Sequence, residues 1–169
     1  MNSVGHNAGD YMVNIAVLVK QVPDTNSKIQ IVGDRVDLSS VKMEISPYDE
    51  FAVENALQHK ESEGGTVTAI TVGNDGADKV LKGVKALGVD NIVRLDYDGY
   101  MDSNGLQSVL ADEIKSGGYD VVYCGKSAAD TGAGSTGPGI AERLGWGSIS
   151  NATEIKFGEG LIVTSPAEG

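Results

Sequence analysis

The stretch Val13-Asn-Ile-Ala-Val-Leu-Val19 decides the fold, because it is apolar at nearly every position. A strand with one wet face alternates apolar and polar residues, whereas a run without alternation indicates a strand that is covered on both faces. Three further strand-like runs follow along the chain, over residues 66–72, 91–95 and 119–124. We therefore expect a sheet of four strands with both faces buried.

Helical patterns separate these four runs. Ser46-Pro-Tyr-Asp49 is typical of a helix start, with Ser at the N-cap, Pro at the first helical position and an acid at the third. This helix should run to about Glu63, and apolar spacing predicts further helices over residues 77–87, 106–114 and 138–144. The alternation predicts an α/β fold: a Rossmann-like parallel sheet with helices on both faces.

Two segments depart from this alternation. Residues 28–38, around Gly33-Asp34, and residues 153–164, around Gly158-Glu-Gly160, alternate apolar and polar side chains and predict two short β-hairpin excursions. No internal repeat or low-complexity linker interrupts the chain. We expect a flexible leader over residues 1–12 and a single nucleotide-binding α/β domain over residues 13–169.

The composition narrows the classes of partner. The 169 residues hold 13 Lys and Arg against 24 Asp and Glu, a formal net charge of −11, which disfavours nucleic acid and anionic membranes as partners. No apolar run approaches the ~20 residues of a membrane span, and the first eleven residues lack the basic start and apolar middle of a signal peptide. The single cysteine, Cys124, fits a reducing compartment. We expect a cytoplasmic protein without membrane insertion.

Ligands in such folds bind beyond the carboxyl ends of the strands, which nominates residues 18–24, 72–76, 95–99 and 125–137. The last segment, Gly125-Lys-Ser-Ala-Ala-Asp-Thr-Gly-Ala-Gly-Ser-Thr-Gly137, is rich in glycine and opens a helix, so its backbone N–H groups can approach a phosphate. It matches neither a Walker loop nor a Rossmann fingerprint at its usual place. A nucleotide-binding loop and a flexible turn before a capped helix are both compatible with it.

Single residues in these segments allow two interpretations each. Lys20 and Lys126 follow strand ends, where they could meet a phosphate or simply be solvated. Asp130 could accept a hydrogen bond from a ribose hydroxyl or cap the turn. Ser135 and Thr136 could cap the next helix or donate to phosphate oxygens.

No side chain stands out as catalytic or metal-ligating. Cys124 ends an apolar strand, which favours a buried, inert thiol. His59 is expected on the polar face of a helix without a Cys or His partner at ligand spacing. Because no acid, base or nucleophile can be argued from the spacing, any chemistry must come from a cofactor or a partner chain.

Six separated blocks, in order along the chain, resemble the electron transfer flavoprotein β-subunit family. The blocks are Asn14-Ile-Ala-Val-Leu-Val-Lys-Gln-Val-Pro-Asp24, Ile45-Ser-Pro-Tyr-Asp-Glu-Phe-Ala-Val-Glu54, Val67-Thr-Ala-Ile-Thr-Val-Gly73, Ala86-Leu-Gly-Val-Asp90, Cys124-Gly-Lys-Ser-Ala-Ala-Asp130 and Thr136-Gly-Pro-Gly-Ile-Ala-Glu-Arg-Leu-Gly-Trp146.

This resemblance implies a heterodimer with an α-subunit that carries FAD, passing electrons from dehydrogenases or NADH to the respiratory chain. The β-subunit itself would hold AMP as a structural ligand, or a further FAD in electron-bifurcating members. The contacts implied by motif position are Leu18, Ser46, Pro47, Tyr48, Asp49, Val72, Gly125, Lys126, Ser127, Ala128, Asp130, Thr131, Gly132, Ala133, Gly134, Ser135 and Thr136.

Two departures from the family pattern bear on the ligand. Bifurcating members usually read Asp-Gly-Asp-Thr, then Ala or Gly, then Gln, where this chain has Asp130-Thr-Gly-Ala-Gly-Ser135, so AMP and FAD both stay open. The chain also stops at Gly169, short of a usual β-subunit, as a shortened homologue or a fragment would. The alternative is a stand-alone adenine-nucleotide-binding module of the universal-stress type, and an interaction domain with an empty crevice is a third possibility.

Overall fold

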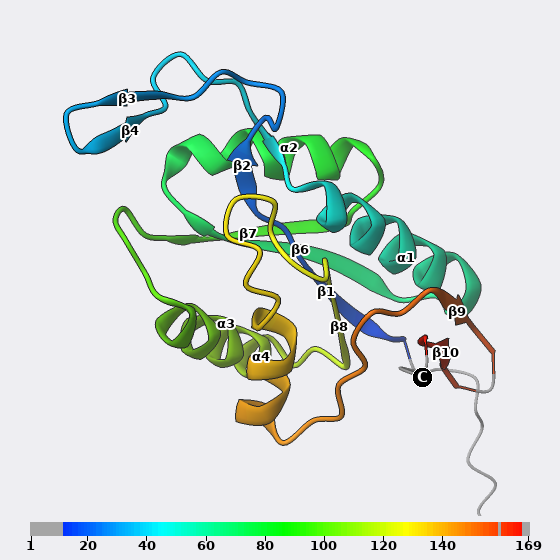
Figure 1. Cartoon of the computed structure of the whole chain (residues 1–169). Coiled ribbons are helices and arrows are strands. Elements are labelled where there is room, and N and C mark those ends of the chain that lie inside the picture. Colours follow the sequence, from blue (N-terminus) through cyan, green and yellow to red (C-terminus); the bar gives the residue numbers. More distant parts are fainter. Residues whose placement is uncertain (1–11, 159, 167–169) are drawn as a thin grey trace, which may run out of the picture.

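A four-stranded parallel sheet forms the centre of the molecule (Figure 1). The computed structural model describes residues 12–158 and 160–166, so the expected leader lies almost wholly outside the described residues. The strands are β1 (Asn14–Leu18), β6 (Thr66–Gly73), β7 (Asn91–Asp96) and β8 (Val121–Cys124), in the spatial order β7-β6-β1-β8. Every pairing in this sheet is parallel, with Ile15 beside both Val67 and Val121.

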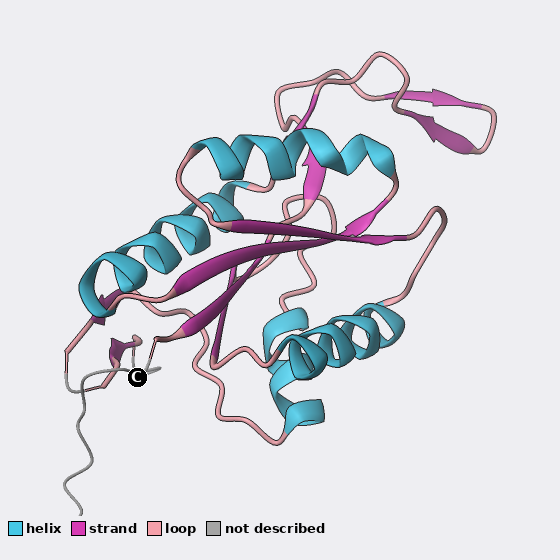
Figure 2. Ribbon diagram, turned by 180° about the vertical axis from the view of Figure 1, so that it is seen from behind, coloured by secondary structure: helices cyan, strands magenta, loops and turns pink. Residues whose placement is uncertain are grey.

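Helices cover both faces of the sheet, which confirms the α/β class (Figure 2). Helices α1 (Pro47–Glu63) and α2 (Asp78–Ala86) lie on one face, with a short 3₁₀ turn, η1 (Asp75–Ala77), before α2. Helices α3 (Ser103–Gly117) and α4 (Thr136–Leu144) lie on the other face and pack against each other.

The first strand shows why its sequence does not alternate. Ile15 and Val17 are fully buried in the core beneath α1 and α2. Ala16 and Leu18 point to the opposite face and join the core beneath α3 and α4. Successive side chains of a strand point to opposite faces, so two buried faces require an apolar residue at each position.

Three antiparallel strand pairs stand apart from the main sheet. The two expected hairpins are present: β3 (Gln30–Val32) with β4 (Arg35–Asp37), and β9 (Glu154–Lys156) with β10 (Ile162–Thr164). A third pair was not expected, because the chain continues past Leu18 into β2 (Gln21–Pro23), which pairs with β5 (Met43–Ile45). This pair brings the carboxyl end of β1 to the start of α1.

The prediction that His59 lies on a polar helix face was wrong, because its side chain is only 4% exposed. The hydroxyl of Tyr123 lies 3.0 Å from its Nδ1, and the Phe157 ring stacks on it at 5.0 Å between ring centres. The Phe157 segment, which lies almost a hundred residues further along the chain, covers this part of α1. Burial also lowers the pKa of His59.

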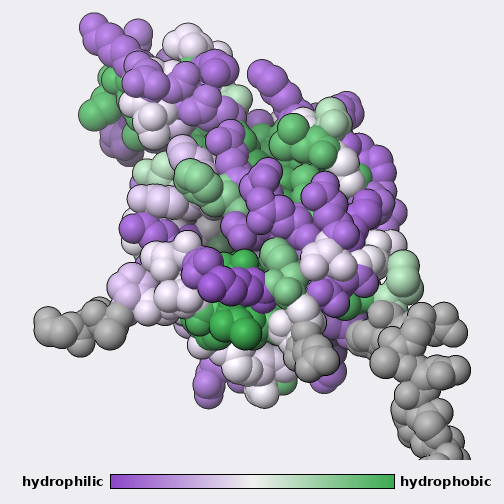
Figure 3. Space-filling view, turned by 90° about the vertical axis from the view of Figure 1, so that its right-hand side faces the viewer, coloured by the Kyte–Doolittle hydropathy of each residue, from purple (hydrophilic) through white to green (hydrophobic). Residues whose placement is uncertain are grey.

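Figure 3 shows hydrophilic and hydrophobic side chains interspersed over the end of the molecule beside α1 and the β9–β10 hairpin. Within residues 12–158 and 160–166, no helix is long and apolar enough to cross a membrane.

Candidate functional site

The strand order reverses beside β1, and that is where such sheets bind ligands. In chain order the four parallel strands are β1, β6, β7 and β8, so the chain builds outward from β1 in one direction and then returns to place β8 on its other side. The first turn of α1 and the glycine-rich loop that begins at Gly125 meet at the carboxyl ends of β1 and β8. We call this meeting point, at the carboxyl ends of β1 and β8, the crevice. Its contacts are made mainly by the side chains of Asp49, Ser46 and Lys20.

Asp49 joins both strand ends to the helix. Its Oδ2 accepts a hydrogen bond from the backbone N–H of Lys20 at 2.8 Å, just past β1. Its Oδ1 accepts one from the backbone N–H of Gly125 at 3.2 Å, just past β8. The carboxylate thus fixes the position at which the glycine-rich loop leaves the sheet.

This carboxyl group is buried, with 7% of the residue exposed. Burial raises the pKa of Asp49 from 3.8 to about 6, against the opposing effect of the two backbone N–H donors. The nearby charge of Lys20 also lowers the pKa, and that of Asp130 raises it. Asp49 therefore changes its charge in the neutral to mildly acidic range, unlike an exposed aspartate.

Ser46 stands at the N-cap position of α1, but its hydroxyl does not cap the helix. Its Oγ accepts a hydrogen bond from the backbone N–H of Ala129 at 3.3 Å, and its own N–H donates to the carbonyl of Lys20 at 2.9 Å. Ser46 is fully buried. The expected capping arrangement is replaced by contacts to the loop and to β1, so Ser46 and Asp49 both hold the loop against α1.

Lys20 and Asp130 form an ion pair across the crevice. The Nζ atom of Lys20 lies 2.8 and 2.7 Å from the two carboxylate oxygens of Asp130. Lys126, the other lysine of interest, lies with its ammonium 4.8 Å from the centre of the Tyr48 ring, a cation–π contact. Both lysines are thus in contact with partners from the site itself.

Gly125 has no room for a side chain. A Cβ atom there would overlap Oδ1 of Asp49 and lie 2.8 Å from the backbone carbonyl carbon of Tyr48. Further along the loop, Gly132 and Gly134 both have φ of +63°, a left-handed conformation that favours glycine. The loop therefore begins tightly packed and continues as an exposed glycine-rich turn.

The remaining residues predicted from the sequence lie at the strand ends, on the first turn of α1 and in the glycine-rich loop. Leu18 is buried, Pro47 and Tyr48 are exposed on the first turn of α1, and Val72 is half-buried at the end of β6. Ser135 does not cap α4 with its side chain: its carbonyl and hydroxyl accept from Nε2 of Gln107. The half-buried or exposed loop residues are Lys126, Ser127, Ala128, Thr131, Gly132, Ala133, Gly134 and Thr136.

A cavity of about 190 Å³ lies beside this cluster, at the carboxyl ends of β1, β6 and β7. Residues from three of the four segments nominated by the sequence line it. They are Lys20, Gln21, Val72, Gly73, Asn74, Tyr97, Asp98 and Gly99, and Ala77 lines the cavity as well. Lys20 connects this cavity with the loop through Asp130. Tyr97 and Asp98 were not singled out by motif matching, although their segment follows a strand end.

Cys124 ends β8 behind the loop. Burial, together with the charge of Asp49, raises the pKa of its thiol to about 11. Such a thiol stays protonated at neutral pH and is a poor nucleophile or metal ligand. Over the described residues, no cluster of three or more His, Cys, Asp or Glu side chains has a geometry that could hold a metal ion.

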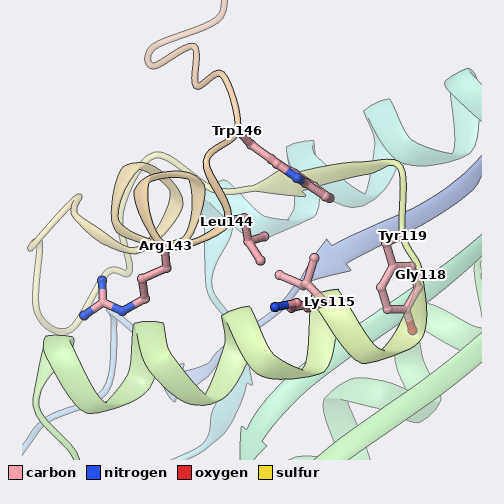
Figure 4. Close-up of a pocket in the computed structure, with 7 residues that line it drawn as sticks. Lys115, Gly118, Tyr119, Arg143, Leu144 and Trp146 are labelled. Carbon is pink, nitrogen blue, oxygen red and sulfur yellow. The ribbon is translucent and has the colours of Figure 1, made fainter.

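A second cavity, of about 240 Å³, lies at the opposite end of the sheet, between α3, α4 and the start of β8 (Figure 4). Trp146, Leu144 and Tyr119 contribute to its walls. The guanidinium of Arg143 points away from Trp146 and donates to Gln107 and Asn104. None of the residues predicted from the sequence lines this cavity.

The parallel sheet, with helices on both faces and a reversal of strand order beside β1, defines a doubly wound α/β domain. The model of the electron transfer flavoprotein domain matches residues 35–169. The chain belongs to this family.

Characterised relatives agree with this assignment. The chain is 35% identical over 148 residues to an electron transfer flavoprotein subunit beta of Bacillus subtilis (strain 168), covering 86% of this chain and 58% of the relative. It is 32% identical to an acryloyl-CoA reductase electron transfer subunit gamma of Anaerotignum propionicum, covering 89% and 59%. It is 34% identical to the protein FixA of Azorhizobium caulinodans, covering 85% and 54%. The chain thus spans between half and two thirds of the length of these relatives.

Proposed function

We propose that the chain is an electron transfer flavoprotein β-subunit-like protein that binds AMP or FAD at the carboxyl ends of its strands. In this proposal it pairs with an FAD-carrying α-subunit and helps pass electrons from dehydrogenases or NADH to the respiratory chain. Relatives named as electron transfer subunits support the role. We place this activity in the cytoplasm.

The observation that carries the proposal is the docking of the glycine-rich loop onto the start of α1 at the reversal of strand order. There, backbone N–H groups, a helix N-terminus and Lys20 can meet a phosphate. The cavity lined by Val72 and Tyr97 can take part of the nucleoside. The residues that would hold the nucleotide are those of the α1 start, the strand ends and the loop.

These residues fit a nucleotide only in part, because Asp49 and Asp130 place two carboxyl groups beside the expected phosphate. When FAD is bound in such a site it supplies the electron-carrying ring, whereas AMP supplies none. The side chains in the crevice would bind and orient the nucleotide. We assign no acid, base or nucleophile role to them.

The ultraviolet-visible spectrum of the purified protein tests the proposal, followed by chromatography of the nucleotide released on denaturation. Flavin bands at about one per chain support FAD in the crevice, and a colourless protein that releases AMP supports a structural nucleotide. Gel filtration with and without an α-subunit tests the pairing. A protein that binds neither nucleotide, added or co-purified, nor an α-subunit would overturn the proposal.

A further inference from the structure

Lys20 and Asp130 link two parts of the crevice that are 110 residues apart in the sequence. Lys20 follows β1, whereas Asp130 lies on the exposed glycine-rich loop. Both carboxylate oxygens lie within 2.8 Å of the ammonium. The two side chains are 40% and 30% exposed, so water and an incoming ligand can both reach the pair.

The same ammonium lines the 190 Å³ cavity, and among the described residues that line it, Lys20 is the one with a basic side chain. Lys126, on the loop, instead lies over the Tyr48 ring. On the acidic side, Asp98 lines the cavity, and Asp49 and Asp130 lie around Lys20. An anion that enters the crevice therefore meets carboxylates and depends on Lys20 for its charge partner.

We propose that Lys20 selects nucleotides that carry a phosphate, and that Asp130 competes with this phosphate for the ammonium. Binding then transfers Lys20 from the Asp130 carboxylate to the phosphate. This inference rests on the proposed function, since it takes an adenine nucleotide as the ligand of the crevice.

The direction of this exchange follows from charge. A phosphate monoester carries about −1.5 to −2 charges at pH 7, whereas the Asp130 carboxylate carries one. A partly exposed lysine–carboxylate pair contributes only about 0–1 kcal/mol, so it opposes the transfer weakly. Hydrogen bonds from an ammonium to a carboxylate and to a phosphate are both charge-assisted, so the larger charge of the phosphate decides the direction. Asp130 thus lowers the affinity for the phosphate without preventing binding.

Calorimetric titrations with AMP and with adenosine test the proposal on the wild type, Lys20→Met and Asp130→Asn. Lys20→Met should weaken AMP binding about tenfold, because a charge-assisted contact is lost, and change adenosine binding by less than about twofold. Asp130→Asn should tighten AMP binding about threefold, because the competitor is gone, and leave adenosine binding unchanged. The opposite signs of the two effects on AMP distinguish competition from a general loss of the site.

Lys42→Met and Glu154→Gln are the matched controls, because each removes one charge from a surface ion pair outside the crevice. Both should leave the ratio of AMP to adenosine affinity as in the wild type. If Asp130→Asn weakens AMP and adenosine alike, Asp130 holds the nucleoside and the inference is wrong. If the wild type binds AMP and Lys20→Met binds it equally well, the inference is wrong, but the proposed function stands. If the wild type binds no nucleotide, the inference is wrong, and the proposed function then depends on pairing with an α-subunit.

Discussion

At the scale of single residues, burial raises the pKa values of two groups in and behind the crevice, the Asp49 carboxyl and the Cys124 thiol. Asp49 is held by two backbone N–H groups, without an ammonium or guanidinium in hydrogen-bond contact with its carboxylate among the bonds of the described residues. Cys124 lies behind it and is affected by its charge. Because both pKa values are raised, each group favours its neutral form in the folded protein. Each raised pKa leads to a testable prediction.

The raised pKa of Asp49 predicts a loss of stability with rising pH. The pKa is about 6 in the folded protein against an ordinary 3.8, so the folded state keeps a proton that the unfolded state releases. The stabilisation is complete below about pH 4 and is lost as the pH rises through about 6, by at most about 3 kcal/mol. Urea unfolding of the wild type and Asp49→Asn between pH 4 and 8 measures this change.

The comparison with Asp49→Asn is necessary because other groups act in the opposite direction. Asp90 and His59 have lowered pKa values, so their contributions rise with pH. The free energy of unfolding of the wild type minus that of the variant should fall between pH 4 and about 6.5 and then level off. A difference that stays constant over this range would contradict the assignment of the proton to Asp49.

The Cys124 thiol should react slowly with alkylating agents. With a pKa of about 11, about one thiol in a thousand is ionised at pH 8, and the thiolate is the reactive form. Iodoacetamide at pH 8 should therefore label the folded protein at least about 100-fold more slowly than glutathione. In urea the labelling should become fast. Labelling of the folded protein at the glutathione rate would mean that the thiol of half-buried Cys124 is not hard to ionise.

At the scale of elements, two glycines make opposite predictions. A Cβ at Gly83, inside α2, would meet no atom within 4 Å, whereas at Gly125 it would overlap Asp49 and Tyr48. Gly83→Ala should raise the free energy of unfolding by about 0.5–1 kcal/mol, because alanine is the better helix former. Gly125→Ala should lower it by about 1–3 kcal/mol through overpacking. Urea unfolding measures both, and a Gly125→Ala variant as stable as the wild type would show that the loop is not held as described.

The main elements were predictable because each carries a local signal. The uninterrupted apolar run of β1, the Ser-Pro start of α1 and the hairpin glycines all depend on neighbours in the chain. The β2–β5 pair was missed because its pairing spans some twenty residues, with the β3–β4 hairpin between the two strands, so no local pattern joins them.

The residues of the candidate site could be nominated from the sequence, but their contacts with one another could not. Ser46 and Asp49 stand where capping residues belong, and a local rule therefore assigns their oxygens to α1. In the fold those oxygens accept from residues 125 and 129, some eighty positions later. His59 illustrates the same limit, since Phe157 covers it from a distant hairpin. Contacts of this range are decided by the tertiary structure, which a local pattern does not contain.

At the scale of the whole molecule, the two hairpins differ in how they attach. The β9–β10 hairpin packs against the body, with Ile155 on the core and Phe157 on His59. The β3–β4 hairpin projects from the body (Figures 1 and 2) and contributes no residue to the buried core of the described chain. Ile31 faces Val36 across its strands, and both are exposed. We expect the β9–β10 hairpin to contribute to the stability of the protein and the β3–β4 hairpin to be dispensable for it.

Phe157→Ala should lower the free energy of unfolding by about 1–3 kcal/mol, because it removes a ring that covers buried His59. Thermal or urea unfolding checks this value. A variant as stable as the wild type would show that the β9–β10 hairpin does not stabilise the body.

Replacing residues 31–36 with Asn-Gly provides the contrasting test. The register places Gln30 opposite Asp37, and Asn-Gly closes such a pair with a two-residue turn. Because the removed residues are mostly exposed, the free energy of unfolding should change by less than about 1 kcal/mol, and AMP affinity should stay as in the wild type. Urea unfolding and AMP titration of the shortened variant measure these two quantities. If shortening this hairpin unfolds the protein or abolishes AMP binding, the hairpin supports the crevice, and the division between an attached and a projecting hairpin is wrong.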